Sequence, residues 1–81
     1  MTDTNETPVQ ENIGYITAIQ GSVIDIRFND KLPPVYNELR TGESRGLIAE
    51  VQAHLDGCTV RALAMGPTRG LFRGQEVVDT E

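Results

Sequence analysis

The sequence has few of the residues that small chains use for covalent or metal cross-links. Its 81 residues include one cysteine, Cys58, one histidine, His54, and no tryptophan. A single cysteine cannot form an internal disulfide, and one cysteine with one histidine leaves a zinc site short of ligands. We therefore expect a fold held together by side-chain packing, with no metal site.

Basic residues, aromatic residues and long apolar runs are also scarce. The chain has 7 Lys and Arg against 12 Asp and Glu, a net charge of −5, and only 5% aromatic residues. Nucleic-acid binding needs a basic face and aromatic stacking platforms, so we expect no nucleic-acid partner. No apolar run approaches the ~18 residues of a membrane helix, and the N-terminus lacks the basic and apolar regions of a signal peptide. These absences predict a soluble domain with no direct membrane contact.

The length of the chain is that of a single domain. Residues 1–12 (MTDTNETPVQEN) hold three acids and no base. A segment this polar buries too little apolar surface to offset the entropy lost on ordering. We therefore predict a disordered acidic tail at 1–12 and a folded domain at 13–81. From residue 13 onward nine acids and seven bases leave a net charge of −2, so most of the acidity lies in the tail.

Short β-branched segments dominate the chain after the tail. The clearest is Ser22–Phe28, in which Ile24, Ile26 and Phe28 share one face and charged residues share the other. This alternation with a period of two is typical of a strand with one buried face. The predicted strands are residues 13–20, 22–28, 35–40, 47–55, 59–65 and 75–79.

The segment Leu47–Leu55 (LIAEVQAHL) fits a helix as well as a strand. As a strand it directs Leu47, Val51 and Leu55 to the core and His54 to solvent. The Asp56-Gly57 pair that follows is a strong hairpin signal, and it favours the strand. A second hairpin is predicted at Gln20-Gly21, which gives six strands and no helix. A sheet this small has exposed edges unless it closes, so we predict an all-β fold: a small closed six-stranded antiparallel barrel.

Glycine and proline mark the loops. The pair Pro33-Pro34 removes two amide donors and predicts a rigid loop at Asn29–Pro34, and Thr41–Gly46 reads as a polar turn. Turns also account for the glycines of the last stretch, which do not match a phosphate-binding fingerprint. These glycines are Gly66, Gly70 and Gly74.

Three groups of residues are candidates for chemistry, and each has a simpler structural explanation. His54 and Cys58 lie four residues apart across the predicted turn, but no motif supports a nucleophilic pair. Asp25 and Glu50 alternate with apolar residues, as on solvated strand faces. A third possibility is that Arg61, Arg69 and Arg73 form a small cationic patch. We predict no catalytic, cofactor-binding or metal-binding residue.

Four stretches carry a resemblance to a known family. They are GYITAIQGSVIDIRF at 14–28, LPPVYNEL at 32–39, LIAEVQAHLDGCTVRALAM at 47–65 and TRGLFRGQEVVDT at 68–80. Together they resemble the N-terminal β-barrel domain of the β subunit of F-type rotary ATP synthases. The match is closer to this subunit than to the α subunit or to the flagellar-export and vacuolar-type relatives.

The resemblance implies a role in assembly. In that family α and β barrels alternate in a ring, the crown of the catalytic hexamer, and α subunits are the partners. ATP or ADP and Mg bind in a following domain with a Walker A loop, and this chain stops at Glu81, before that domain. The resemblance thus implies a fragment that is not itself an enzyme. It comes from an ion-translocating ATP synthase, a peripheral complex on the cytoplasmic side of a bacterial or archaeal membrane.

Two other functions remain open from the residues themselves. One is an independent small barrel that binds a ligand or nucleic acid, and the other is a small enzyme that uses His54 and Cys58. A reading frame that continues past Glu81 into a Walker A sequence distinguishes the assembly domain from both.

Overall fold

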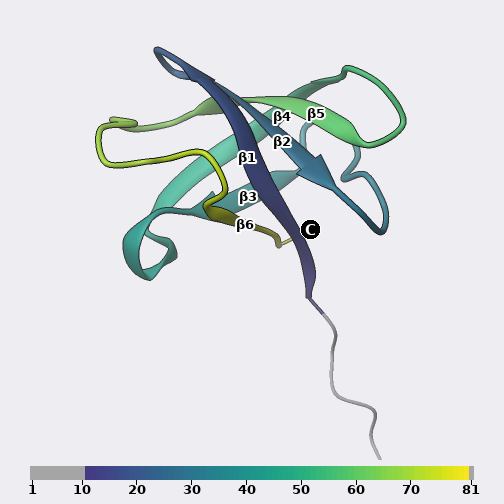
Figure 1. Cartoon of the computed structure of the whole chain (residues 1–81), viewed down its shortest axis with the longest axis horizontal. Helices are drawn as coiled ribbons and strands as arrows, with labels where there is room; N and C mark the ends of the chain where they lie inside the picture. Colours follow the sequence, from purple (N-terminus) through teal and green to yellow (C-terminus); the bar gives the residue numbers. More distant parts are fainter. Residues whose placement is uncertain (1–10, 81) are drawn as a thin grey trace, which may run out of the picture.

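Six antiparallel strands form one closed barrel in the computed structural model, which describes residues 11–80 (Figure 1). The predicted fold class is thereby confirmed. The strands are β1 (Asn12–Gln20), β2 (Val23–Phe28), β3 (Glu38–Thr41), β4 (Leu47–His54), β5 (Thr59–Ala64) and β6 (Glu76–Asp79), and a short 3-10 helix η1 (Glu43–Arg45) precedes β4.

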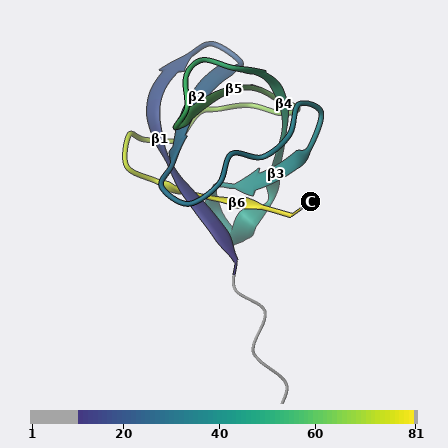
Figure 2. The ribbon, with the colours of Figure 1, turned by 90° about the vertical axis from the view of Figure 1, so that its right-hand side faces the viewer.

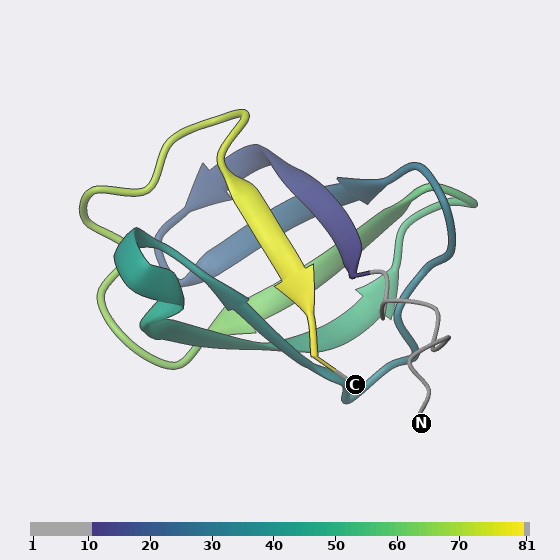
Figure 3. The same ribbon diagram turned by 90° about the horizontal axis from the view of Figure 1, so that it is seen from below.

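The last strand closes the barrel. Around the ring the order is β1-β2-β5-β4-β3-β6, and β6 pairs with β3 on one side and with β1 on the other (Figure 3). Viewed from one end the strands make a continuous ring (Figure 2). Closure gives every strand in residues 11–80 two neighbours, so none of them has a wholly unpaired edge.

The two ends of the barrel carry different segments. At one end, here called the terminal end, lie the loop 29–37, the turn 55–58 and both Asn12 and Thr80. This end faces the viewer in Figure 2. The opposite end carries the turn 21–22, η1 and the loop 65–75. Any surface of the molecule therefore belongs to the wall, the terminal end or the opposite end.

The core is a single apolar cluster inside the ring. In β2 the predicted alternation is confirmed, because Ile24, Ile26 and Phe28 are at most 2% exposed. The strands contribute inward side chains at every second position, as a barrel requires. The members of the cluster are Ile16, Ile24, Ile26, Phe28, Leu39, Ala49, Val51, Val60, Ala62 and Val77.

Gly14 lets β1 come close to the core side chains of β2. A Cβ atom at this position would lie 2.8 Å from Ile26 Cγ2, 2.8 Å from Phe28 Cε2 and 2.9 Å from the carbonyl oxygen of Arg27. These separations are shorter than van der Waals contact, so any side chain here forces the two strands apart. Gly14 is thus required by packing and not by a turn.

The strand β4 contains a bulge, and one orientation predicted near its end is wrong. The pairing of β4 with β5 shifts register between Val51 and Ala53, after which His54 lies opposite the buried Val60. The sequence predicts an inward Leu55, yet Leu55 is 43% exposed. Leu55 follows the last residue of β4 and lies in the turn 55–58, where the strand alternation no longer applies. A second bulge, in β1 between Ile16 and Ala18, adds to the strand curvature that closure needs.

Most predicted strand bounds agree with the structure to within a residue, and β3 is the exception. The predicted strand 35–40 is observed at Glu38–Thr41, because Tyr36 has φ 79° and ends a turn. The predicted turn 41–46 starts later, since Thr41 is buried in β3, and it contains η1.

The first hairpin turns at Gly21 and Ser22, one residue later than predicted. Gly21 has φ 61°, the sign that a type II′ turn requires at its first position. Of the predicted tail, 1–10 lies outside the described residues.

The hairpin between β4 and β5 forms where Asp56-Gly57 predicts it, but by a different mechanism. Gly57 does not have a positive φ, which a type I′ turn requires. Instead Asp56 Oδ1 accepts hydrogen bonds from the backbone N–H of Cys58 at 2.8 Å and of Thr59 at 2.9 Å. The N–H of Cys58 is the main cause that lowers the pKa of Asp56 from its ordinary value, and Thr59 adds to it. The carboxylate therefore closes this turn.

Replacing Gly14 with alanine tests the close approach of β1 to the core. We expect Gly14→Ala to lower the free energy of unfolding by about 1–3 kcal/mol, because the added methyl group overpacks the interior. The control is Gly57→Ala, since nothing lies within 4 Å of a Cβ there; its effect should stay within about 0.5 kcal/mol. Urea unfolding followed by circular dichroism measures both, and equal effects would contradict the packing explanation.

The Asp56 turn predicts a dependence of stability on pH. Because its folded pKa is lowered, Asp56 stabilises the fold above its unfolded pKa, and this contribution is lost as pH falls through the folded value. Asp56→Asn keeps an acceptor oxygen but not the charge, whereas Asp56→Ala loses both. At neutral pH we expect the urea midpoint to be highest for the wild type, lower for Asp56→Asn and lowest for Asp56→Ala. The gap between wild type and Asp56→Asn should shrink in acid, and a gap that does not change with pH would be evidence against this mechanism. Asp30→Asn controls for net charge.

Candidate interaction surfaces

The wall of the barrel carries the two acids that the sequence singled out, and the structure does not pair them. Asp25 on β2 accepts from Arg61 on β5 at 2.9 and 3.1 Å, a bidentate ion pair between directly opposed residues. Glu50 lies on β4 and accepts from Gln52 of its own strand at 3.0 Å. Since β5 separates the two strands, the arrangement is a solvated wall with cross-strand pairs.

The three arginines of the candidate cationic patch occupy two different parts of the molecule. Arg61 lies on the wall, and the carboxylate of Asp25 is the main cause that raises its pKa. Arg69 and Arg73 lie in the loop 65–75 at the opposite end. Of the glycines in this stretch, Gly70 and Gly74 have φ 97° and 90°, which confirms their role in turns.

His54 and Cys58 have separate partners. His54 Nε2 donates to the carbonyl oxygen of Pro33 at 2.8 Å, so the imidazole fixes the proline loop to β4. His54 is exposed, so the predicted solvent-facing orientation is confirmed, and this hydrogen bond is a contact that the sequence did not predict. Cys58 is half-buried in the turn, and its carbonyl oxygen accepts from Phe28 N at 2.8 Å. Both residues connect segments at the terminal end.

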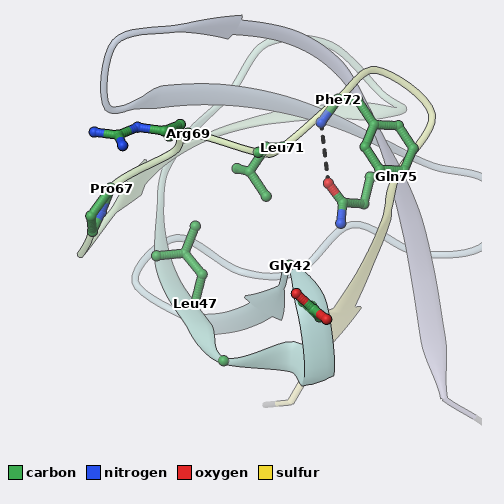
Figure 4. A pocket seen from close by; sticks show the side chains of 10 residues that line it. Gly42, Leu47, Pro67, Arg69, Leu71, Phe72 and Gln75 are labelled. Atoms are coloured by element: carbon green, nitrogen blue, oxygen red, sulfur yellow. Dashed lines mark hydrogen bonds between the residues drawn. The ribbon is translucent and has the colours of Figure 1, made fainter.

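A shallow hollow of about 480 Å³ lies at the opposite end of the barrel (Figure 4). Leu47 and Leu71 point into it from facing sides, and Gly42 lies beneath them. Its loop wall is held by a hydrogen bond of 3.1 Å from Phe72 N to Gln75 Oε1. Phe72 is 58% exposed, so this end offers an apolar surface.

A buried polar cluster fixes the terminal end. Asp79 is 7% exposed, and its two carboxylate oxygens accept from Asn37 Nδ2 at 3.1 Å and from Asn12 Nδ2 at 3.3 Å. Asn12 Nδ2 also donates to the carbonyl oxygen of Lys31 at 2.8 Å. The cluster joins β1, β6 and the loop before β3. No sequence pattern predicts this cluster, because its members lie up to 67 residues apart in the chain.

The chain leaves the barrel beside this cluster. Thr80 donates to the carbonyl oxygen of Glu38 from its N–H at 3.2 Å and from its hydroxyl at 2.9 Å. The start of the described chain is held as well, because Glu11 forms a bidentate pair with Arg45 at 2.9 and 3.1 Å. That hydrogen bonding is the main cause that lowers the pKa of Glu11. Both ends of the described chain are therefore anchored to the barrel.

Two further searches cover only residues 11–80. Within this range no three His, Cys, Asp or Glu side chains are grouped so that they can hold a metal ion. In the same part of the chain no helix is long and apolar enough to cross a membrane.

Comparison with known proteins agrees with the fold. Residues 16–81 match the family model described as "ATP synthase alpha/beta family, beta-barrel domain". The chain is 44% identical over 80 residues to ATP synthase subunit beta 2 of Polaromonas naphthalenivorans, with 99% of this chain and 17% of that protein covered. It is 45% identical over 75 residues to ATP synthase subunit beta 1 of Marinomonas sp., with 86% and 15% covered. It is 46% identical over 69 residues to ATP synthase subunit beta 2 of Albidiferax ferrireducens, with 85% and 13% covered. The chain thus spans less than a fifth of the length of these relatives.

Removing the amide of Asn37 tests the buried cluster. We expect Asn37→Ala to lower the free energy of unfolding by about 1–3 kcal/mol, because a buried carboxylate loses a donor. Gln52→Ala is the control, since that amide also serves a carboxylate, but on the exposed wall; it should change stability by less than about 0.5 kcal/mol. Urea unfolding measures both, and a loss of similar size in the control would show that the burial of Asp79 is not decisive.

Proposed function

The chain belongs to the ATP synthase alpha/beta family, whose β-barrel domain it matches, and from this we propose that it is the crown domain of a β-type subunit. In this role the barrel packs side by side with the barrels of neighbouring α subunits. It holds an alternating hexamer together while other domains open and close.

The observation that carries this proposal is the closure of the sheet. Within residues 11–80 each of the six strands has two paired neighbours, so no strand offers a neighbour a full-length free edge for backbone hydrogen bonds. Neighbouring barrels must then associate through side chains on the wall and at the ends. A closed, densely hydrogen-bonded ring also deforms little, which suits a part that stays fixed while the rest of a machine moves.

The proposal divides the work within a longer subunit. The residues of this chain bind neither nucleotide nor metal and take no part in catalysis. ATP or ADP with Mg binds in the remainder of the subunit, where synthesis or hydrolysis is coupled to ion transport. The whole complex is peripheral to the cell membrane, on its cytoplasmic side, and this barrel does not touch the lipid.

Separating the barrel from the rest of the subunit tests this division. The full-length subunit and a version without residues 1–81 are each mixed with the α subunit, and native mass spectrometry measures the hexamer. We expect the shortened version to lose the hexamer but to keep Mg-ATP binding in calorimetry, and the 81-residue chain alone to give no binding heat.

Two results would contradict the proposal. One is a hexamer that forms equally well without the barrel, and the other is Mg-ATP binding by the 81-residue chain. A reading frame that stops after Glu81 would also exclude a β-type subunit, and it would favour an independent binding module.

A further inference from the structure

The turn before β3 holds an aromatic residue in a strained backbone conformation. Asn37 N donates to the carbonyl oxygen of Pro34 at 3.1 Å, so residues 34–37 form a β-turn. Tyr36 occupies the third position with φ 79°. This sign of φ at that position is typical of a type II turn, where glycine is preferred because a Cβ atom is crowded there. A tyrosine at such a position costs backbone strain.

Several contacts hold this turn in place. Tyr36 N donates to the carbonyl oxygen of Val51 at 2.7 Å, and Val51 N donates to the carbonyl oxygen of Asn37 at 3.0 Å. The Asn37 amide also binds the buried Asp79 at 3.1 Å. The strained conformation is therefore imposed by the barrel. Strained residues that the surrounding structure fixes in this way concentrate at functional sites.

The contacts hold only the backbone of Tyr36, and its side chain projects into solvent. Tyr36 is 74% exposed, the largest value among the exposed large hydrophobic residues, and Val35 beside it is 37% exposed. An exposed tyrosine presented on a rigid turn is typical of an interface anchor, because little conformational entropy is lost when it binds.

A second feature of the terminal end lies beside this turn. A hollow of about 270 Å³ is lined by Lys31, Pro34, Asn37 and Asp79. Pro34 and Asn37 are the first and last residues of the turn. A neighbour that packs on Tyr36 can therefore also fill this hollow.

We infer that Val35 and Tyr36 form an anchor for the part of the same subunit that follows Glu81, a surface with an apolar pocket and an acceptor for the phenol hydroxyl. The inference rests on the proposed function, since it needs the longer subunit. Its direct support is the path of the chain: Thr80 is bonded to Glu38, two residues from Tyr36. A segment that continues from there meets the turn at high effective concentration, unlike a separate subunit.

Photo-cross-linking in the full-length subunit tests the anchor. A benzophenone amino acid replaces Tyr36 in one variant and Phe72 in the control, because Phe72 is 58% exposed but lies at the opposite end. We expect the position-36 probe to link to peptides beyond residue 81 of its own chain and the position-72 probe not to do so. Links from position 36 only to another subunit, or no intrachain link, would overturn the inference. The hexamer is measured separately, so the anchor can fail while the crown role stands.

Tyr36→Gly gives a second readout that a merely structural role would not produce. In the 81-residue chain glycine relieves the strain, so we expect the thermal midpoint to rise by a few degrees. In the full-length subunit the anchor is lost, so we expect the midpoint of the barrel to fall. A rise in both proteins would overturn the inference. Phe72→Gly is the matched control and should change the midpoint by the same amount in both.

Discussion

The pairing of β6 with both β1 and β3 closes the barrel. Without β6 the sheet would have two open edges, at β1 and at β3. Closing a ring of only six strands bends each strand sharply, and the structure meets this demand locally. It places bulges in β1 and β4 and a glycine at position 14, where β1 approaches the core.

Closure constrains the wall of the barrel more than its ends. The wall must alternate inward and outward side chains, so polar residues are limited to exposed positions such as the Asp25–Arg61 pair. At the terminal end the alternation stops with the strands. There the buried carboxylate of Asp79, the strained backbone of Tyr36 and the hydrogen bonds of Thr80 lie within one small region.

The sequence predicted what depends on local pattern and missed what depends on contacts across the ring. The alternation of Ile24, Ile26 and Phe28 follows from burial of one face, so the sequence predicts it. The bulge after Val51 accommodates the curvature of the closed barrel. The residues of β4 by themselves give no sign of this bulge. Leu55 was predicted to face the core and is 43% exposed, whereas His54 is exposed as predicted. Asp56-Gly57 predicted the hairpin correctly, and the structure shows that the carboxylate of Asp56 closes it. The Asn12–Asn37–Asp79 cluster joins three distant segments and could only be found in three dimensions.

The hydrogen bonds that hold Thr80, just after β6, bear on how the barrel transmits force. In the proposed role, a barrel that is loosely connected to the rest of its subunit would transmit little force. A flexible connection would stretch before the barrel itself was loaded. Here Thr80 is bonded twice to Glu38, and Asp79 just before it is held by two amides. The strand β6 thus closes the barrel and also leads directly to Thr80. A pulling force on Thr80 therefore acts directly on the strand that closes the barrel, and its backbone pairs with β1 and β3 resist that force. Such resistance suits the proposed crown role, in which the barrel stays fixed while other domains move.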